Sequence, residues 1–181
     1  MTPDFTELYR FHAKYNRWIN GRMYAACENL TDDERKRDRG AFFGSIHRTL
    51  NHLVVTDQVW LRRFARSGLE NGLRFEMLDG DLITIPEAYA LDMVPHADWD
   101  DLKAKRAQLD DAIDQWTASM PAAYPQMPMA YSNSRGTRRE HPAWQAMTHL
   151  FNHQTHHRSQ AITLLTQAGV DIGVTDMLAL M

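Results

Sequence analysis

The sequence has little cysteine, no excess of positive charge and no long apolar run, and each shortage excludes a class of protein. Its 181 residues include a single cysteine, Cys27, so no internal disulfide and no cysteine-based zinc site can form. No apolar run approaches the length of a membrane span, and no basic segment followed by an apolar one opens the chain. The net charge of −3 leaves no basic footprint for nucleic acid. We therefore expect a cytoplasmic, soluble protein that binds neither membrane nor nucleic acid.

Several common catalytic and architectural signatures are also missing. We find no Gly-rich phosphate loop, no Ser-His-Asp order and no convincing pair of carboxylates. Repeats, linkers and low-complexity segments are missing as well. The basic run Arg35–Arg39 follows three acidic residues, which favours a solvated surface helix with balanced charge. The length suits one hydrophobic core, so we expect a single domain over residues 1–181.

Apolar residues recur at helical intervals in four long segments. We expect helices over 3–29, 44–66 and 98–120. A fourth helix has Pro142 in its first turn and includes the stretch 144–169. Thr31 and Glu34 form a capping box that opens a short helix between the first two. The irregular stretch 68–96 is long enough to cross the molecule, and 130–139 suggests a small hairpin. The prediction is an all-α, antiparallel four-helix bundle with a long crossover connection and a short irregular or hairpin insertion before the last helix.

Some polar residues lie at helical spacing within these apolar segments. His12, Asn16 and Asn20 share a face of the first helix, where we favour a solvated stripe over the lining of a cavity. Gln154 and Arg158 fall near the middle of the apolar arc of the fourth helix. That helix is therefore not cleanly amphipathic.

Two carboxylates within the helices also have candidate roles. Asp110 follows Arg106 by four residues, so the two can form an ion pair. Asp57 lies about one turn beyond His52, where it could orient a ligand or water. For Asp57 we favour the simpler interpretation of a surface or capping carboxylate.

Histidines are concentrated in the fourth helix, at positions 149, 153, 156 and 157. Residues three or four apart share a face, so His149 with His153, or His153 with His157, could hold two imidazoles over one metal ion. At about 100° per residue, His157 lies roughly 80° and His153 roughly 120° from the centre of the apolar face. His149 and His156 fall roughly opposite the core. The pair best placed to point inward is therefore His153 and His157.

Two imidazoles do not complete a site, because catalytic zinc centres have three protein ligands and an open position. His52 shares a helix face with Trp60 and can be aimed at the fourth helix, whereas His47 is five residues away and cannot point the same way. The pattern favours a histidine-rich mononuclear metal site over a chance cluster. The candidates for its third ligand are His12, His47, His52, His96 and His141.

Four motifs carry a resemblance to a known family. They are YNRWIN at 15–20, NHL at 51–53 followed by WL at 60–61, the segment 102–116 with Arg106, Leu109 and Asp110, and NHQTHHRSQ at 152–160. Together they resemble the DinB/YfiT family, which is unrelated to the DNA polymerase that shares the DinB name. The resemblance spans nearly the whole chain, and the last motif is its most specific part. Ser159 departs from the family pattern, which usually has Gly there.

The resemblance implies a four-helix bundle that holds one divalent ion through His52, His153 and His157. Imidazole suits Zn²⁺, Ni²⁺, Co²⁺ or Fe²⁺, and of these we favour zinc or nickel. An open position holding water would allow the ion to act as a Lewis acid or as a source of hydroxide. Family members are often dimers, so we also expect a homodimer.

The wider superfamily includes thiol-dependent transferases and isomerases. The resemblance therefore implies a metal-dependent thiol S-transferase or hydrolase that takes a small thiol or electrophile. The alternative is a non-catalytic, stress-associated metal-binding protein. A DNA-binding role is suggested by the family name alone, and the acidic balance argues against it. No dedicated general base is evident in the sequence.

Overall fold

The structure is a computed structural model that describes residues 5–86, 89–133 and 135–180. Over these residues the chain is mostly helical and carries one two-stranded sheet. No helix in the described ranges is long and apolar enough to cross a membrane. The elements are α1 (Phe5–Cys27), α2 (Asp32–Lys36), α3 (Ile46–Glu70), α4 (Trp99–Ser119), β1 (Pro128–Ser132), β2 (Arg138–Pro142) and α5 (Ala143–Gln167).

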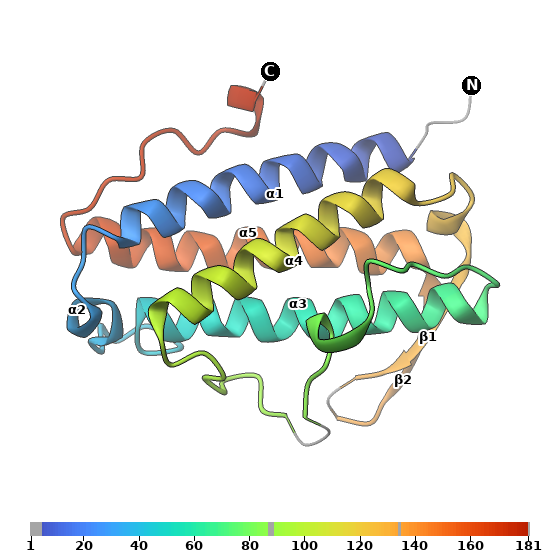
Figure 1. The fold of residues 1–181 in the computed structure, drawn as a ribbon, viewed down its shortest axis with the longest axis horizontal. Helices are drawn as coiled ribbons and strands as arrows, with labels where there is room; N and C mark the ends of the chain where they lie inside the picture. Colours follow the sequence, from blue (N-terminus) through green and yellow to red (C-terminus); the bar gives the residue numbers. More distant parts are fainter. Residues whose placement is uncertain (1–4, 87–88, 134, 181) are drawn as a thin grey trace.

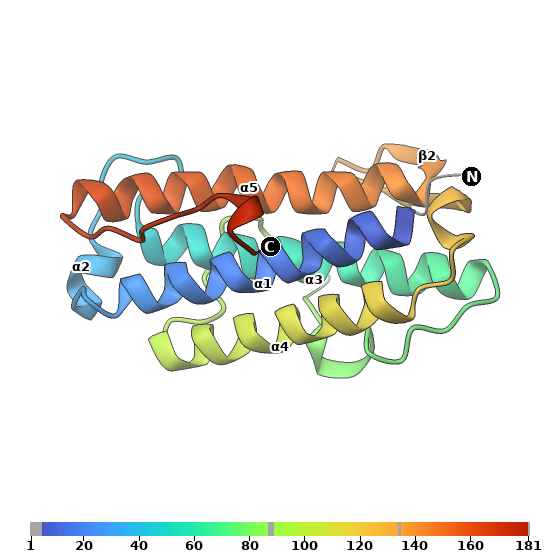
Figure 2. The same cartoon turned by 90° about the horizontal axis from the view of Figure 1, so that it is seen from above.

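The long helices α1, α3, α4 and α5 lie side by side along the molecule (Figures 1 and 2). Neighbours α1 and α4 run antiparallel, as do α3 and α5. In contrast, α3 and α4 run in the same direction, because residues 71–98 return the chain to the end at which α3 began. Two hydrogen bonds between Asn51 and the backbone of His96, of 3.0 and 3.1 Å, fasten the end of this crossover to α3.

The ends of several elements differ slightly from the sequence prediction. Helix α3 continues to Glu70, and Pro142 ends β2 as the residue before α5 instead of lying in the first helical turn. The predicted hairpin forms, with Pro128 opposite Pro142 and Ser132 opposite Arg138. Its residue 134, and the expected helix start at residue 3, lie outside the described residues. The predicted capping box of α2 forms: the Thr31 hydroxyl accepts from the Glu34 backbone N–H, and the Glu34 carboxylate accepts from the Thr31 backbone N–H.

The core is built from the apolar faces of the long helices. Trp116 of α4 is fully buried and stacks on Phe64 of α3 with ring centroids 4.6 Å apart. Tyr124 and Phe75, from segments outside the long helices, pack edge-on against each other at 5.0 Å. This aromatic cluster closes the end of the molecule at which α3 and α4 both finish.

The prediction of a solvated stripe on α1 is wrong for Asn16 and Asn20, because each of these side chains is only 1% exposed. Their side-chain amides donate to Asp110 at 3.0 and 2.9 Å. The reason is the partner helix: α4 presents a buried carboxylate that needs donors, and α1 supplies them. His12, on the same face, is half-buried and stacks on Phe151 at 5.3 Å.

The expectation that Asp57 is a surface or capping carboxylate is also wrong. Asp57 is 0% exposed and accepts hydrogen bonds from Arg106, at 2.6 Å, and from Gln154. Arg106 also pairs with Asp110 at 3.0 Å, as predicted. Arg158 donates to Asn16 and to Gln154. Gln154 and Arg158 therefore lie in the apolar arc of α5 because they join a buried polar network that links all four long helices.

The basic run at 35–39 is not uniformly solvated. Arg35 is 8% exposed and donates to the carbonyl oxygens of Cys27, the last residue of α1, and of Leu30 in the turn that follows. Its guanidinium also lies over the Trp99 ring, 4.5 Å from the centroid. The short helix α2 is thus held against the bundle by one buried arginine.

Candidate metal centre

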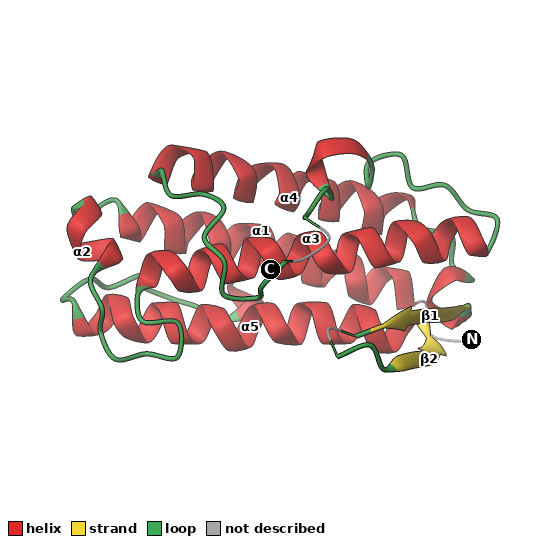
Figure 3. Cartoon of the chain, turned by 90° about the horizontal axis from the view of Figure 1, so that it is seen from below, coloured by secondary structure: helices red, strands yellow, loops and turns green. Residues whose placement is uncertain are grey.

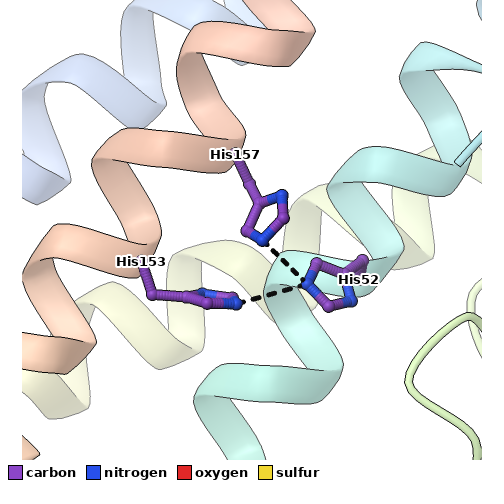
Figure 4. A group of neighbouring side chains, drawn as sticks. All are labelled: His52, His153 and His157. Carbon is purple, nitrogen blue, oxygen red and sulfur yellow. Dashed lines mark hydrogen bonds between the residues drawn. The ribbon is translucent and has the colours of Figure 1, made fainter. Parts of the chain in front are cut away.

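Three histidines from two helices meet at one point (Figure 4). The Nε2 atom of His52, on α3, lies 3.3 Å from Nε2 of His153 and 3.2 Å from Nε2 of His157, both on α5. All three ligand atoms lie within 4.8 Å of one another. The helical spacing puts His153 and His157 on one face of α5, and the antiparallel neighbour α3 brings His52 to it. These are the three residues that the sequence and the family resemblance selected.

The outer ring nitrogens fix which nitrogen carries the proton in two of the imidazoles. Nδ1 of His52 lies 2.7 Å from the carbonyl oxygen of Leu91, and Nδ1 of His157 lies 2.8 Å from Oε1 of Gln160. Both oxygens only accept hydrogen bonds, so both Nδ1 atoms must donate. In the neutral imidazoles the lone pair is then on Nε2, the atom that faces the cluster centre.

This tautomer leaves two lone pairs facing each other at 3.2 Å, between His52 and His157. Neither can donate to the other, and His153 can offer a proton to only one of them. Within the described chain, the buried Nδ1 of His153 has no partner either. A cation at the centre would satisfy all three Nε2 atoms at once.

The distances also suit a metal ion. Zinc–nitrogen bonds of about 2.0–2.1 Å in tetrahedral geometry place two ligand nitrogens about 3.3–3.4 Å apart. The two Nε2 separations at His52 are 3.3 and 3.2 Å. Two of the three separations therefore match a mononuclear divalent site, and the third pair of ligand atoms lies within 4.8 Å.

The surroundings keep the three imidazoles uncharged. Burial lowers the pKa of His52. Burial together with the neighbouring imidazoles lowers the pKa of His153 to about 3 and that of His157 to about 4. For His157 the Gln160 hydrogen bond opposes this shift without reversing it. Metal ligation requires neutral imidazole, so the ligands are already in their binding form at neutral pH.

A cleft of about 810 Å³ opens onto the three Nε2 atoms. The loop between α2 and α3 forms one wall, where the Phe43 ring stacks on His52 with centroids 4.1 Å apart. Leu91 and Asp92 of the crossover and Arg48 of α3 also line the cleft. The centre is thus open to a small molecule on one side and walled by an aromatic ring on another.

The other histidines do not join this group. His149 and His156 are exposed, as the helical wheel predicted, although the His149 ring also packs on Trp60 at 4.9 Å. His47 and His96 lie near Asn51 instead. His12 and His141 pair with aromatic side chains elsewhere.

Sequence reasoning missed the groups that orient the ligands. Gln160 had a usable signal, because it stands three residues after His157 on the same helix face. The Leu91 oxygen had none, since every residue carries a backbone carbonyl. Phe43 had none either, because it lies in a short loop without periodicity.

The fold and the site together define a class of protein: a mostly helical chain in which three histidines converge from two neighbouring helices. The DinB family model matches residues 5–181, so the chain belongs to the DinB family. A comparison with curated proteins gives no match, and neither does one with solved structures.

Proposed function

We propose that this DinB protein binds one divalent transition ion, zinc or nickel, through the Nε2 atoms of His52, His153 and His157. We further propose that it is a metal-dependent enzyme, either a thiol S-transferase or a hydrolase. The observation that carries the metal proposal is the pair of Nε2 lone pairs of His52 and His157, which face each other 3.2 Å apart while both Nδ1 atoms donate elsewhere.

The protein's own groups fit the role of holding the ion and admitting a small reactant. The Leu91 carbonyl and Gln160 fix two rings by their outer nitrogens, which is the usual support for metal-bound histidine. Phe43 shields one face of His52 from water. When bound, the ion would supply Lewis acidity that lowers the pKa of a thiol or of water. The adjoining cleft has room for a small thiol or electrophile.

The metal proposal is tested by elemental analysis of purified protein. We expect about one equivalent of zinc or nickel in the wild type and a loss of most of it in His153→Ala. His156→Ala is the matched control, because His156 is exposed on the same helix and is not one of the three convergent residues. Equal metal content in His153→Ala and the wild type would contradict the ligand assignment.

The catalytic proposal needs a separate assay. Metal-loaded protein is incubated with small thiols and electrophiles, and in parallel with a panel of esters. We expect turnover with one of the two substrate classes that is lost in His153→Ala. Metal binding without turnover across both panels would favour the alternative, a non-catalytic metal-binding protein.

We also propose a four-helix bundle made of two antiparallel helix pairs, α1 with α4 and α3 with α5, one domain over residues 1–181, a cytoplasmic location and a homodimer. The arrangement of α1, α3, α4 and α5 supports the bundle. Phe42, a large apolar side chain that is 86% exposed at the rim of the cleft, supports a contact with a second copy. Light scattering of the wild type and of Phe42→Ser tests the dimer, and we expect the variant to be more monomeric.

A further inference from the structure

A second pocket, of about 200 Å³, is lined by His52 and His153 and, on the side of the hairpin, by Tyr131. Figure 3 shows this hairpin, β1 and β2, beside the start of α5. We call it the hairpin pocket. It shares His52 and His153 with the metal centre, and its lining also includes Arg63, Trp60, Tyr89 and Tyr131. Its walls come from α3, α5, β1 and the crossover. A molecule lying in it could reach the metal centre at one end and Arg63 at the other.

Arg63 contributes the positive charge of this pocket. Its guanidinium lies over the Trp60 ring at 4.7 Å and over the Tyr131 ring at 4.5 Å. One nitrogen donates to the Ser132 carbonyl at 3.1 Å. No carboxylate in the described parts of the chain lies within ion-pairing distance of it. A half-buried guanidinium thus lies against two rings, and no acidic group among the described residues pairs with its charge.

The helix geometry aims this charge toward the metal centre. His52, Thr56, Val59 and Arg63 follow one another at spacings of four, three and four residues, so they share one face of α3. Eleven residues rise about 16 Å along a helix, and side chains tilt toward its N-terminus. The longer Arg63 side chain reaches back along α3 as far as the Trp60 ring, one turn nearer to His52.

We propose that the hairpin pocket binds a substrate carboxylate at Arg63, so that the reacting group of the same molecule lies at the three-histidine centre. This rests on the proposed function, since the reacting group is defined by the metal site. A carboxylate matches the guanidinium fork and carries the single negative charge that one arginine neutralises. The rings of Trp60, Tyr89 and Tyr131 provide an apolar wall for the connecting chain.

The test uses two six-carbon thiols that differ only at the far end, 6-mercaptohexanoate and 6-mercaptohexan-1-ol. Each is titrated into zinc-loaded protein while the Trp60 indole N–H is followed by NMR. We expect the wild type to bind the carboxylate about tenfold more tightly than the alcohol, the size expected of one charge-assisted hydrogen bond. Arg63→Gln should bind both equally. The matched control is Arg62→Gln, which changes the exposed neighbouring arginine and should keep the preference.

An unchanged preference in Arg63→Gln would overturn the proposal, even if that variant is less stable, because stacking on two rings would then be the whole role of Arg63. If Arg63→Gln does not fold, Arg63→Lys replaces it. The lysine keeps the charge without the planar fork, so we expect a reduced preference, and an unchanged one again overturns the proposal.

A second arm separates this proposal from the metal proposal. Hexanoate and hexan-1-ol, which lack the thiol, are titrated into metal-free protein with the same readout. If the wild type binds no metal but prefers hexanoate in a manner that depends on Arg63, the metal proposal fails and the carboxylate site stands. If metal binds and no carboxylate preference appears in either arm, the carboxylate site fails alone.

Discussion

At the scale of single residues, the buried charges are the most demanding feature of this molecule. Asp57 and Asp110 both lie inside the core, and Arg106 contacts both, at 2.6 and 3.0 Å. Burial raises the pKa of each carboxyl, to about 6 for Asp110, while Arg106 opposes the shift. One guanidinium therefore supports two carboxylates that would otherwise be costly to ionise.

Arg106→Met should destabilise the protein by about 3–5 kcal/mol, because it leaves two buried carboxylates without their cation. Urea denaturation measures the change in the free energy of unfolding. Arg66→Met is the control, since Arg66 pairs with Glu70 at 2.8 Å on the surface and such pairs are worth at most about 1 kcal/mol. Similar losses in both variants would contradict the role assigned to Arg106.

Gln160 is the side chain that orients a proposed ligand from outside the centre. Its Oε1 accepts the Nδ1 proton of His157 at 2.8 Å. We expect Gln160→Ala to weaken metal binding by about 10–100-fold, the usual cost of losing such support. Competition with a chelator gives the affinity. Ser159→Ala, one residue earlier and exposed, should leave it within about twofold.

At the scale of elements, the three histidines come from two helices, α3 and α5. The geometry of the site therefore depends on how α5 is rotated about its axis. His153 and His157 face α3, while their sequence neighbours Gln154 and Arg158 enter the buried polar network. The network and the histidines therefore constrain the same helix from adjacent faces. A turn of α5 about its axis would break both sets of contacts together.

Two glycines test how helix and loop contribute to stability, with opposite signs expected. Gly21 lies inside α1 with open space where a Cβ would stand, so Gly21→Ala should stabilise the protein by about 0.5–1 kcal/mol. Gly44 has φ +78° in the loop that carries Phe43, so Gly44→Ala should destabilise it by about 1–2 kcal/mol. Thermal denaturation of both variants measures the difference. Changes of the same sign would contradict the backbone argument.

At the scale of the whole molecule, the site brings together residues that are about a hundred positions apart in the chain. His52 lies 101 residues before His153 and 105 before His157. The crossover adds a third separate segment through the Leu91 carbonyl. Because these groups meet only in the folded protein, the state of the imidazoles is linked to the stability of the entire fold.

This linkage predicts a pH dependence for the metal-free protein. The folded pKa values of His153 and His157, about 3 and 4, lie below the ordinary value of about 6.5 that unfolded histidine has. Between these values the unfolded chain binds more protons than the folded one, so stability is present above about pH 6.5 and falls as pH drops toward 4. Melting curves in chelator at pH 7 and 4.5 measure the loss. His153→Phe should show a smaller loss, and an equal one would contradict the assignment.

The sequence by itself determined the features that depend on local order. Helical periodicity located the four long helices to within a few residues, and the capping box located α2. The spacing of His153 and His157 indicated a ligand pair, but the residues alone left five candidates for the third position. Only the family resemblance singled out His52, because no local pattern says which residue of another helix will face a given point.

The tertiary structure alone decided which polar residues are inside. Asn16, Asn20 and Asp57 were predicted to be solvated. A polar residue on one helix gives the same sequence pattern whether it faces water or polar side chains of a partner helix. Their burial follows from the mutual rotation of four helices, which no single segment encodes. The hydrogen bond between His52 and the Leu91 carbonyl is of the same kind, because it forms only once distant segments are brought together. The contact of Arg63 with the Tyr131 ring is another example, since α3 and β1 meet only in the folded protein.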